Sequence, residues 1–150
     1  ISLSQEMPDF LPDRIEAGTH NMPGIAGLLA GIRFVRRQGT QAILRHEHAL
    51  TCRTAESLRR LPGVEVFAHP GCLAQAGVVS FRVPGRDAET VGEALARRGI
   101  AVRAGLHCAP LAHRTAGTLD TGTVRVSFSA FNTPQEADRL AEAVGDILRR

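Results

Sequence analysis

The chain has 150 residues, is 43% hydrophobic and carries a formal net charge of +3, with six histidines and three cysteines. This length favours one domain with a core of its own, and no apolar run is long enough to cross a bilayer. The first residues lack the basic and apolar regions of a signal peptide. An odd number of cysteines without paired spacing argues against a disulfide framework, so we expect a cytoplasmic protein.

All 18 residues counted as Lys or Arg are arginine, so the chain contains no lysine. These arginines are spread along the sequence without a basic stripe, and there is no Trp or Tyr on which bases could stack. Both features argue against nucleic-acid binding. Solvated faces are the expected place for most of these arginines.

The first part of the chain divides into an arm and two helices. Residues 1–22 are rich in proline and polar residues and show no periodicity, so we interpret them as an extended arm ahead of a domain over 23–150. From Pro23, apolar residues recur three and four apart, which predicts a helix that ends at Gly39. A second helix is expected over about 40–60, and we expect the two helices to form a hairpin.

The remaining elements alternate between strands and helices. Strands are predicted over 64–68, 76–83, 100–103 and 123–129 from their β-branched and aromatic residues. One helix follows Asp87, and the last helix begins after Thr133, where Glu136 completes a capping box. The order predicts an α+β fold: a two-layer sandwich in which helices pack on one face of a small mixed sheet.

Two arginines flank a loop that contains a glycine. Strict alternation over 123–129 turns Val124 and Val126 to one side and Arg125 to the other. A guanidinium on a rigid strand matches a carboxylate bidentately, although a solvent-facing arginine is the alternative interpretation. Arg103 ends the preceding strand and has the same two interpretations. Together the two residues suggest an anion site.

Cys108 lies in this loop, in the stretch "AVRAGLHCAP". A catalytic cysteine needs a lowered pKa, and Arg103, Arg125 and His107 could lower it if the fold brings them close. The alternative is a small buried hydrophobe, an interpretation that suits Cys52 and Cys72 better. The sequence has no CxxC or HxxxH pattern, so we expect no metal site.

The arm contains a third motif, "RIEAGTHNMPGIAGL". Gly18 and Thr19 precede the first predicted helix, where a hydroxyl and backbone amides could hold a phosphate. The alternative is a loop in which Asn21 simply caps that helix.

Three segments resemble the C-terminal part of class V aminotransferase-like, pyridoxal phosphate (PLP)-dependent enzymes, most closely the cysteine desulfurase and selenocysteine lyase group: "RIEAGTHNMPGIAGLLAGIRFV", "VRAGLHCAPLAHRTAGT" and "GTVRVSFSAFNTPQEADRL". The resemblance implies that Cys108 takes sulfur from substrate cysteine as a persulfide and that Arg125 grips the substrate carboxylate. It also implies that Arg103 lines the same pocket. Thr19, beside Gly18, would reach the cofactor phosphate across a homodimer interface.

The sequence also departs from this family. The lysine that holds PLP as a Schiff base lies in a large N-terminal domain, and this chain has no lysine. In addition, "HCAP" has one residue fewer between Cys and Pro than is common in the group. We therefore interpret the chain as a C-terminal domain fragment that is inactive alone and binds no PLP stably.

For the intact parent, the resemblance implies a homodimer that converts L-cysteine to L-alanine and passes sulfur to an acceptor protein, with no nucleic-acid or membrane partner. Two alternatives remain. One is another class V reaction, such as transamination, epimerisation or lyase chemistry, in which Cys108 has no role. The other is a non-catalytic binding or dimerisation domain.

Overall fold

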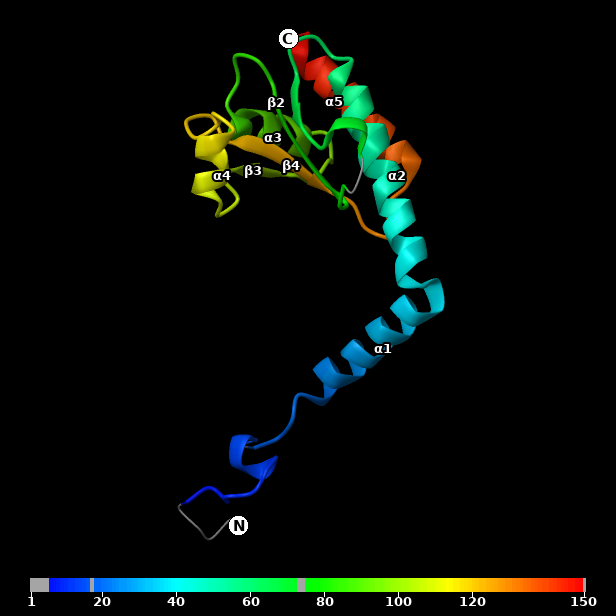
Figure 1. Cartoon of the computed structure of the whole chain (residues 1–150), viewed down its shortest axis with the longest axis vertical. Helices are drawn as coiled ribbons and strands as arrows, with labels where there is room; N and C mark the ends of the chain where they lie inside the picture. The colour runs from blue at the N-terminus through cyan, green and yellow to red at the C-terminus, as the bar shows by residue number, and fades with distance from the viewer. Residues whose placement is uncertain (1–5, 17, 73–74, 150) are drawn as a thin grey trace. The chain divides into compact units, whose positions relative to one another are not determined.

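The computed structural model describes residues 6–16, 18–72 and 75–149, and the chain divides into two compact units, Ile1–Gly39 and Thr40–Arg150 (Figure 1). Residues 1–5 and 17 of the predicted arm lie outside the described residues. The division into an arm over 1–22 and a domain over 23–150 stays a prediction. Among the described residues, no helix combines the length and the apolar character that a membrane span requires.

The first unit contains a short 3-10 helix, η1 (Asp13–Ile15), and the helix α1 (Met22–Gln38). The Asn21 side chain caps α1 by accepting a hydrogen bond from the Gly24 amide at 3.0 Å. Gly39 ends the helix, as its position in the sequence predicts, with a positive φ of 83° and its amide donating to the Val35 carbonyl. No residue of α1 is buried. The predicted hairpin with the second helix stays a prediction, because the two helices belong to different units.

The second unit is built on a four-stranded sheet in the order β1-β2-β4-β3, with β1 (Glu65–Phe67), β2 (Val78–Arg82), β3 (Arg103–Gly105) and β4 (Thr123–Ser127). Each neighbouring pair is antiparallel. The α+β class is therefore confirmed, but the expectation of a mixed sheet is wrong. Strands β2 and β3 run in the same direction, joined through the helix α3 (Ala88–Ala96), yet β4 lies between them and prevents a parallel pair.

Three helices cover one face of this sheet: α2 (Thr40–Arg59), α3 and α5 (Pro134–Leu148) (Figure 1). Phe81 and Val124, which pair across β2 and β4, are almost completely buried on that face. They form one apolar cluster with side chains from all three helices, including Leu58, Leu95 and Val144. Burial of this cluster stabilises the unit and leaves the opposite face of the sheet available for polar side chains.

The helix α5 begins with the predicted capping box. The Thr133 hydroxyl accepts from the Glu136 amide, and the Glu136 carboxylate accepts from the Thr133 amide at 2.7 Å. On the surface, Arg53 of α2 donates to both carboxylate oxygens of Asp138 of α5, at 2.6 and 2.7 Å. This bidentate bond lowers the pKa of Asp138 and joins the two helices side by side.

Two elements differ from the prediction. Strand β3 covers Arg103–Gly105 instead of 100–103, because the Ile100 amide donates to the Leu95 carbonyl and ends α3 instead of joining the sheet. The helix α4 (Pro110–Thr115) was not predicted. Six residues are too few to show apolar periodicity, although Pro110 does occupy its first turn.

The end of β3 lies unusually close to the residue that precedes β4. A Cβ atom on Gly122 would lie 2.9 Å from the Cα atom of Gly105, and Gly122 has a φ of 63°. No other residue type fits this position without displacing the backbone that leads into the loop with Cys108.

The close approach can be separated from the backbone conformation by two substitutions. Gly117 has a similar φ of 66°, but a Cβ atom there would meet nothing within 4 Å. We expect Gly122→Ala to lower the free energy of unfolding by about 1–3 kcal/mol more than Gly117→Ala, because only the former adds a steric clash. Urea denaturation followed by circular dichroism measures both. Equal losses of unfolding free energy in the two variants would show that the backbone at Gly105 can move away from residue 122 without cost.

Candidate active site

A row of side chains crosses the face of the sheet opposite the helical core. Phe67 pairs with Ser80, Ser80 with Arg125, and Arg125 with Arg103. Directly paired residues point to the same face of a sheet, so all four side chains share this face. The predicted orientation of Arg125, opposite to Val124, is therefore confirmed. Successive side chains of β4 therefore point alternately to the apolar core and to the candidate site.

Cys108 lies in a tight turn between β3 and α4. The Ala109 amide donates to the Leu106 carbonyl at 2.9 Å, and the two residues between them, His107 and Cys108, have φ values of 51° and 58°. This combination is typical of a type I′ turn, whose two central positions favour Asn and Gly. Both positions hold residues with a Cβ atom, so the turn is strained and the surrounding structure must hold it. The turn leaves Cys108 exposed.

The His107 ring is fixed by one nitrogen and lacks a partner at the other. Its Nε2 lies 3.1 Å from the carbonyl oxygen of Thr123 and 3.2 Å from the Thr123 hydroxyl. A carbonyl only accepts, so Nε2 carries the proton. The Nδ1 atom is buried and has no hydrogen-bond partner among the residues that the structure describes. Burial, followed by the charge of Arg125, lowers the pKa of His107.

This lowered pKa bears on the predicted role of His107. The ring is neutral at pH 7, since its ordinary pKa is already about 6.5. It therefore adds no positive charge beside Cys108. Of the three groups that the sequence suggested for lowering the pKa of the thiol, only the two arginines are cations.

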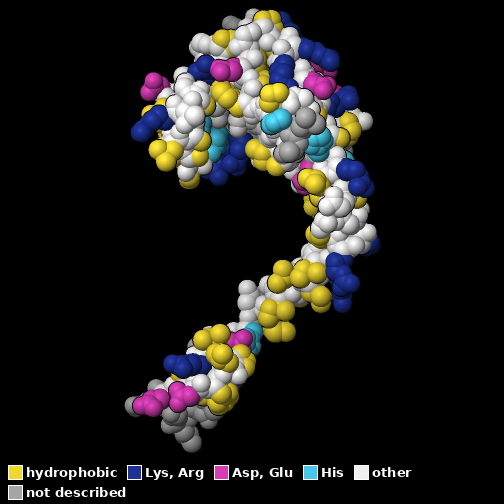
Figure 2. Space-filling view, viewed as in Figure 1, with side chains coloured by type: hydrophobic (Ala, Val, Ile, Leu, Met, Phe, Trp, Pro, Cys, Tyr) yellow, Lys and Arg dark blue, Asp and Glu magenta, His cyan; other side chains and the backbone are white. Residues whose placement is uncertain are grey.

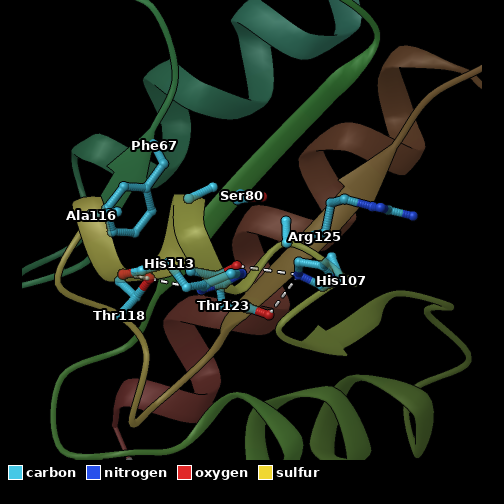
Figure 3. Close-up of a pocket in the computed structure, with 10 residues that line it drawn as sticks. Phe67, Ser80, His107, His113, Ala116, Thr118, Thr123 and Arg125 are labelled. Carbon is cyan, nitrogen blue, oxygen red and sulfur yellow. Dashed lines mark hydrogen bonds between the residues drawn. The ribbon is translucent and has the colours of Figure 1, made fainter.

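A pocket of about 320 Å³ lies between this row and α4 (Figure 3). Its apolar wall consists of Phe67 with Ala109, Ala112 and Ala116, and its polar residues are Ser80, His107, His113, Thr118, Thr123 and Arg125. His113 is buried, and its Nδ1 lies 2.8 Å from the Thr118 hydroxyl. The rings of His107 and His113 are inclined at 45°, with their centroids 5.7 Å apart.

The arginines of the site have no anionic partner among the described residues. Arg125 lines the pocket and is partly buried, and its Nε atom is buried without a hydrogen-bond partner. Arg103, directly opposite on β3, is exposed. Neither forms a salt bridge with a described carboxylate. Two like charges at paired positions repel, so this arrangement favours a bound anion.

The structure brings together some of the predicted site residues. Arg125 lines the pocket, while Arg103 and Cys108 do not, although both adjoin residues of the site. Gly18 and Thr19 belong to the other unit, where both are exposed. Sequence analysis missed His113 and Thr118. The only signal for them was a polar pair five residues apart, shortly after Cys108.

The other two cysteines have a different environment. Cys72 is buried and Cys52 partly buried, and burial raises the pKa of Cys52 to about 12, with a hydrogen bond between the Cys52 and Cys72 side chains acting in the same direction. A thiol of this kind stays protonated and is a poor nucleophile. The described residues contain no group of three or more His, Cys, Asp or Glu side chains that could hold a metal ion.

Known proteins are similar to this chain in sequence and in fold. The family model for aminotransferase class-V matches residues 1–140. A cysteine desulfurase of Synechococcus elongatus is 41% identical over 136 residues, which are 91% of this chain and 21% of that protein. The chain thus spans about a fifth to a third of the length of the relatives it matches and corresponds to their C-terminal portion.

Solved structures agree with this assignment. An apo cysteine desulfurase from Thermococcus onnurineus NA1 is 39% identical, with a TM-score of 0.82 over 92% of this chain and 34% of that one. A more distant relative, a C-DES mutant, has glycine covalently linked to its PLP cofactor. It is 25% identical, with a TM-score of 0.63 over 89% of this chain and 31% of that one. The chain belongs to the aminotransferase class-V family, and its relatives in that family include cysteine desulfurases.

Proposed function

We propose that the intact protein containing this chain is a PLP-dependent cysteine desulfurase that converts L-cysteine to L-alanine and leaves a persulfide on Cys108. The observation that carries the proposal is an exposed cysteine in a strained turn, flanked by residues of the pocket that Arg125 also lines, and the buried Nε of Arg125 lacks a partner among the described residues. The desulfurase relatives support the same reaction.

Arg125 binds the substrate carboxylate in this proposal. Arg125 lines the pocket from β4, and its guanidinium carries a planar fork of N–H donors that matches two carboxylate oxygens. A carboxylate would also give the orphaned Nε–H an acceptor. Arg103 lies at the paired position on β3 and adds positive charge at the edge of the same site.

Cys108 accepts the sulfur. Its thiolate attacks the sulfur of the bound cysteine, and an S–S bond forms as the C–S bond of the substrate breaks. The electron pair of that C–S bond, with a proton, becomes a C–H bond of alanine. The products are therefore alanine and a Cys108 persulfide, and the exposure of Cys108 allows an acceptor protein to reach it.

PLP, when bound, supplies the electron sink that lets bonds in the amino acid break. The residues of this chain fit the substrate side of such a site but not covalent attachment, because the chain has no lysine. We infer that another part of the intact protein supplies the lysine. Gly18 and Thr19 are exposed, and we assign them to the cofactor phosphate in a homodimer.

The missing lysine leads to a test on the 150-residue chain itself. We expect the purified chain, mixed with PLP and dialysed, to show no absorbance band of a lysine Schiff base and no activity on L-cysteine. Absorbance spectroscopy after dialysis measures this directly. A retained band would contradict the assignment of the attachment site to another part of the protein.

Replacing the nucleophile tests the reaction. We expect Cys108→Ser in the intact protein to lower alanine formation from L-cysteine by roughly a thousandfold or more, because the sulfur acceptor is lost. Mass spectrometry of the wild-type peptide should show the added sulfur on Cys108.

Cys52→Ser provides the matched control, since the raised pKa of Cys52 keeps that thiol protonated. It should retain activity. Full turnover of L-cysteine by Cys108→Ser would transfer the function to another reaction of the family, such as transamination, epimerisation or a lyase reaction. Absence of any reaction in the wild type would favour a non-catalytic domain.

The carboxylate contact can be tested separately. We expect Arg125→Lys to raise KM for L-cysteine roughly tenfold to a hundredfold, because an ammonium replaces a bidentate fork with a point charge. Steady-state kinetics measure the change. Arg114→Lys, on the exposed surface of α4, should leave KM unchanged. An unaltered KM in Arg125→Lys would place the carboxylate elsewhere.

A further inference from the structure

We propose that His113, anchored by Thr118, is a positioning residue that acts through His107 to hold Cys108 at the angle needed for sulfur transfer. The inference rests on the proposed desulfurase function and adds a role for two residues of the same pocket. It starts from the strain in the turn that carries the cysteine.

The turn needs support because two consecutive residues adopt a left-handed backbone. His107 and Cys108 have φ values of 51° and 58°, which residues with a Cβ atom rarely adopt. Only the surroundings can keep such a pair in place. Cys108 is exposed, whereas the His107 ring is partly buried and hydrogen-bonded to Thr123, so we take His107 as the residue through which the turn is fixed.

His107 is held from two directions. On one side, Nε2 donates to the carbonyl of Thr123 in β4 at 3.1 Å. On another, its ring contacts the ring of His113 in α4, with a centroid separation of 5.7 Å. The hydrogen bond restrains one atom of the ring, whereas the ring contact restrains its tilt. Figure 3 shows His107, Thr123 and His113 meeting at the pocket.

His113 can restrain its neighbour because it is itself fixed. It is 6% exposed, and Thr118 is 1% exposed. Its Nδ1 lies 2.8 Å from the Thr118 hydroxyl, and the Thr118 amide donates to the His113 carbonyl at 2.9 Å. The same hydroxyl lies 3.5 Å from that carbonyl, to which it donates, so Nδ1 of His113 carries the proton. Three hydrogen bonds therefore join His113 in the last turn of α4 to Thr118 in the following loop.

Burial and nearby charge favour the form of His107 that this geometry uses. Burial, and after it the charge of Arg125, lowers the pKa of His107, although the hydrogen bond to the Thr123 carbonyl acts in the opposite direction. The neutral ring retains a single N–H, and that N–H is directed at the Thr123 carbonyl. Thr118 thus influences the turn through the placement of His113, without touching Cys108.

The test uses the intact protein, loaded with PLP and supplied with L-cysteine. Thr118→Val removes the hydroxyl at nearly constant volume, and Thr118→Ser keeps the hydroxyl as the matched control. We expect Thr118→Val to lower kcat for persulfide formation roughly tenfold or more with KM unchanged, because small misplacement of a reacting group costs rate, while Arg125 still binds substrate. Thr118→Ser should retain most of the wild-type kcat.

Two further measurements separate positioning from general damage. Alkylation of Cys108 by iodoacetamide should change less than twofold in Thr118→Val, since a small free reagent attacks an exposed thiol from any direction. Nitrogen-15 NMR of the histidine rings should show the pKa of His107 rising towards its ordinary value. On a His107→Gln background, Thr118→Val should have no further effect on kcat, because the two residues act as one unit.

Each result decides the inference. A kcat of Thr118→Val within twofold of wild type, or the same loss of kcat with and without His107, would overturn the positioning role and leave the desulfurase proposal intact. Absence of persulfide on wild-type Cys108 would overturn both. If Thr118→Val does not fold, His113→Phe keeps the ring volume, removes the anchoring hydrogen bond and is expected to give the same fall in kcat.

Discussion

The alternation of strand β4 is the constraint on which the rest of this structure depends. β4 pairs with β2 on one side and β3 on the other, so it is the strand through which the sheet is continuous. Val124 and Val126 enter the apolar core, and Arg125 enters the pocket on the opposite face. A shift of one residue in the pairing would exchange these environments and bury a guanidinium in the core. Hydrophobic burial therefore fixes the place of the charged residue.

The second constraint is steric and concerns the loop that carries Cys108. Gly122 brings the start of β4 against Gly105 at the end of β3, which no larger residue allows without displacement. After Gly105, the chain passes through His107 and Cys108, both with a left-handed backbone, before α4 begins. This conformation is unfavourable in isolation, and contacts with β4 and α4 hold it. Strain in such a turn is typical of functional sites, where the backbone must present one side chain.

The three cysteines show how environment decides the chemistry of one residue type. Cys52 belongs to α2 and Cys72 to the segment that follows β1. Burial raises the pKa of Cys52 to about 12. Cys108 is exposed, and its neighbours His107 and Ala109 line the pocket that Arg125 also lines. Thiolate chemistry needs access, and Cys108 is the exposed cysteine of the three.

The sequence by itself determined the α+β order of elements, the capping of α5 and the face to which Arg125 points, because these follow from local periodicity and short-range hydrogen bonds. It also singled out Cys108 and the two arginines. The tertiary structure alone decided that β4 separates β2 from β3, that His107 is neutral, and that His113 and Thr118 support it. Strand order, burial and ring contacts depend on residues far apart in the chain, which no local pattern records. The helix α4 has only six residues, which is too short for an apolar period to be recognised in the sequence. A helix of this length is stabilised by its tertiary contacts, which the sequence does not show directly.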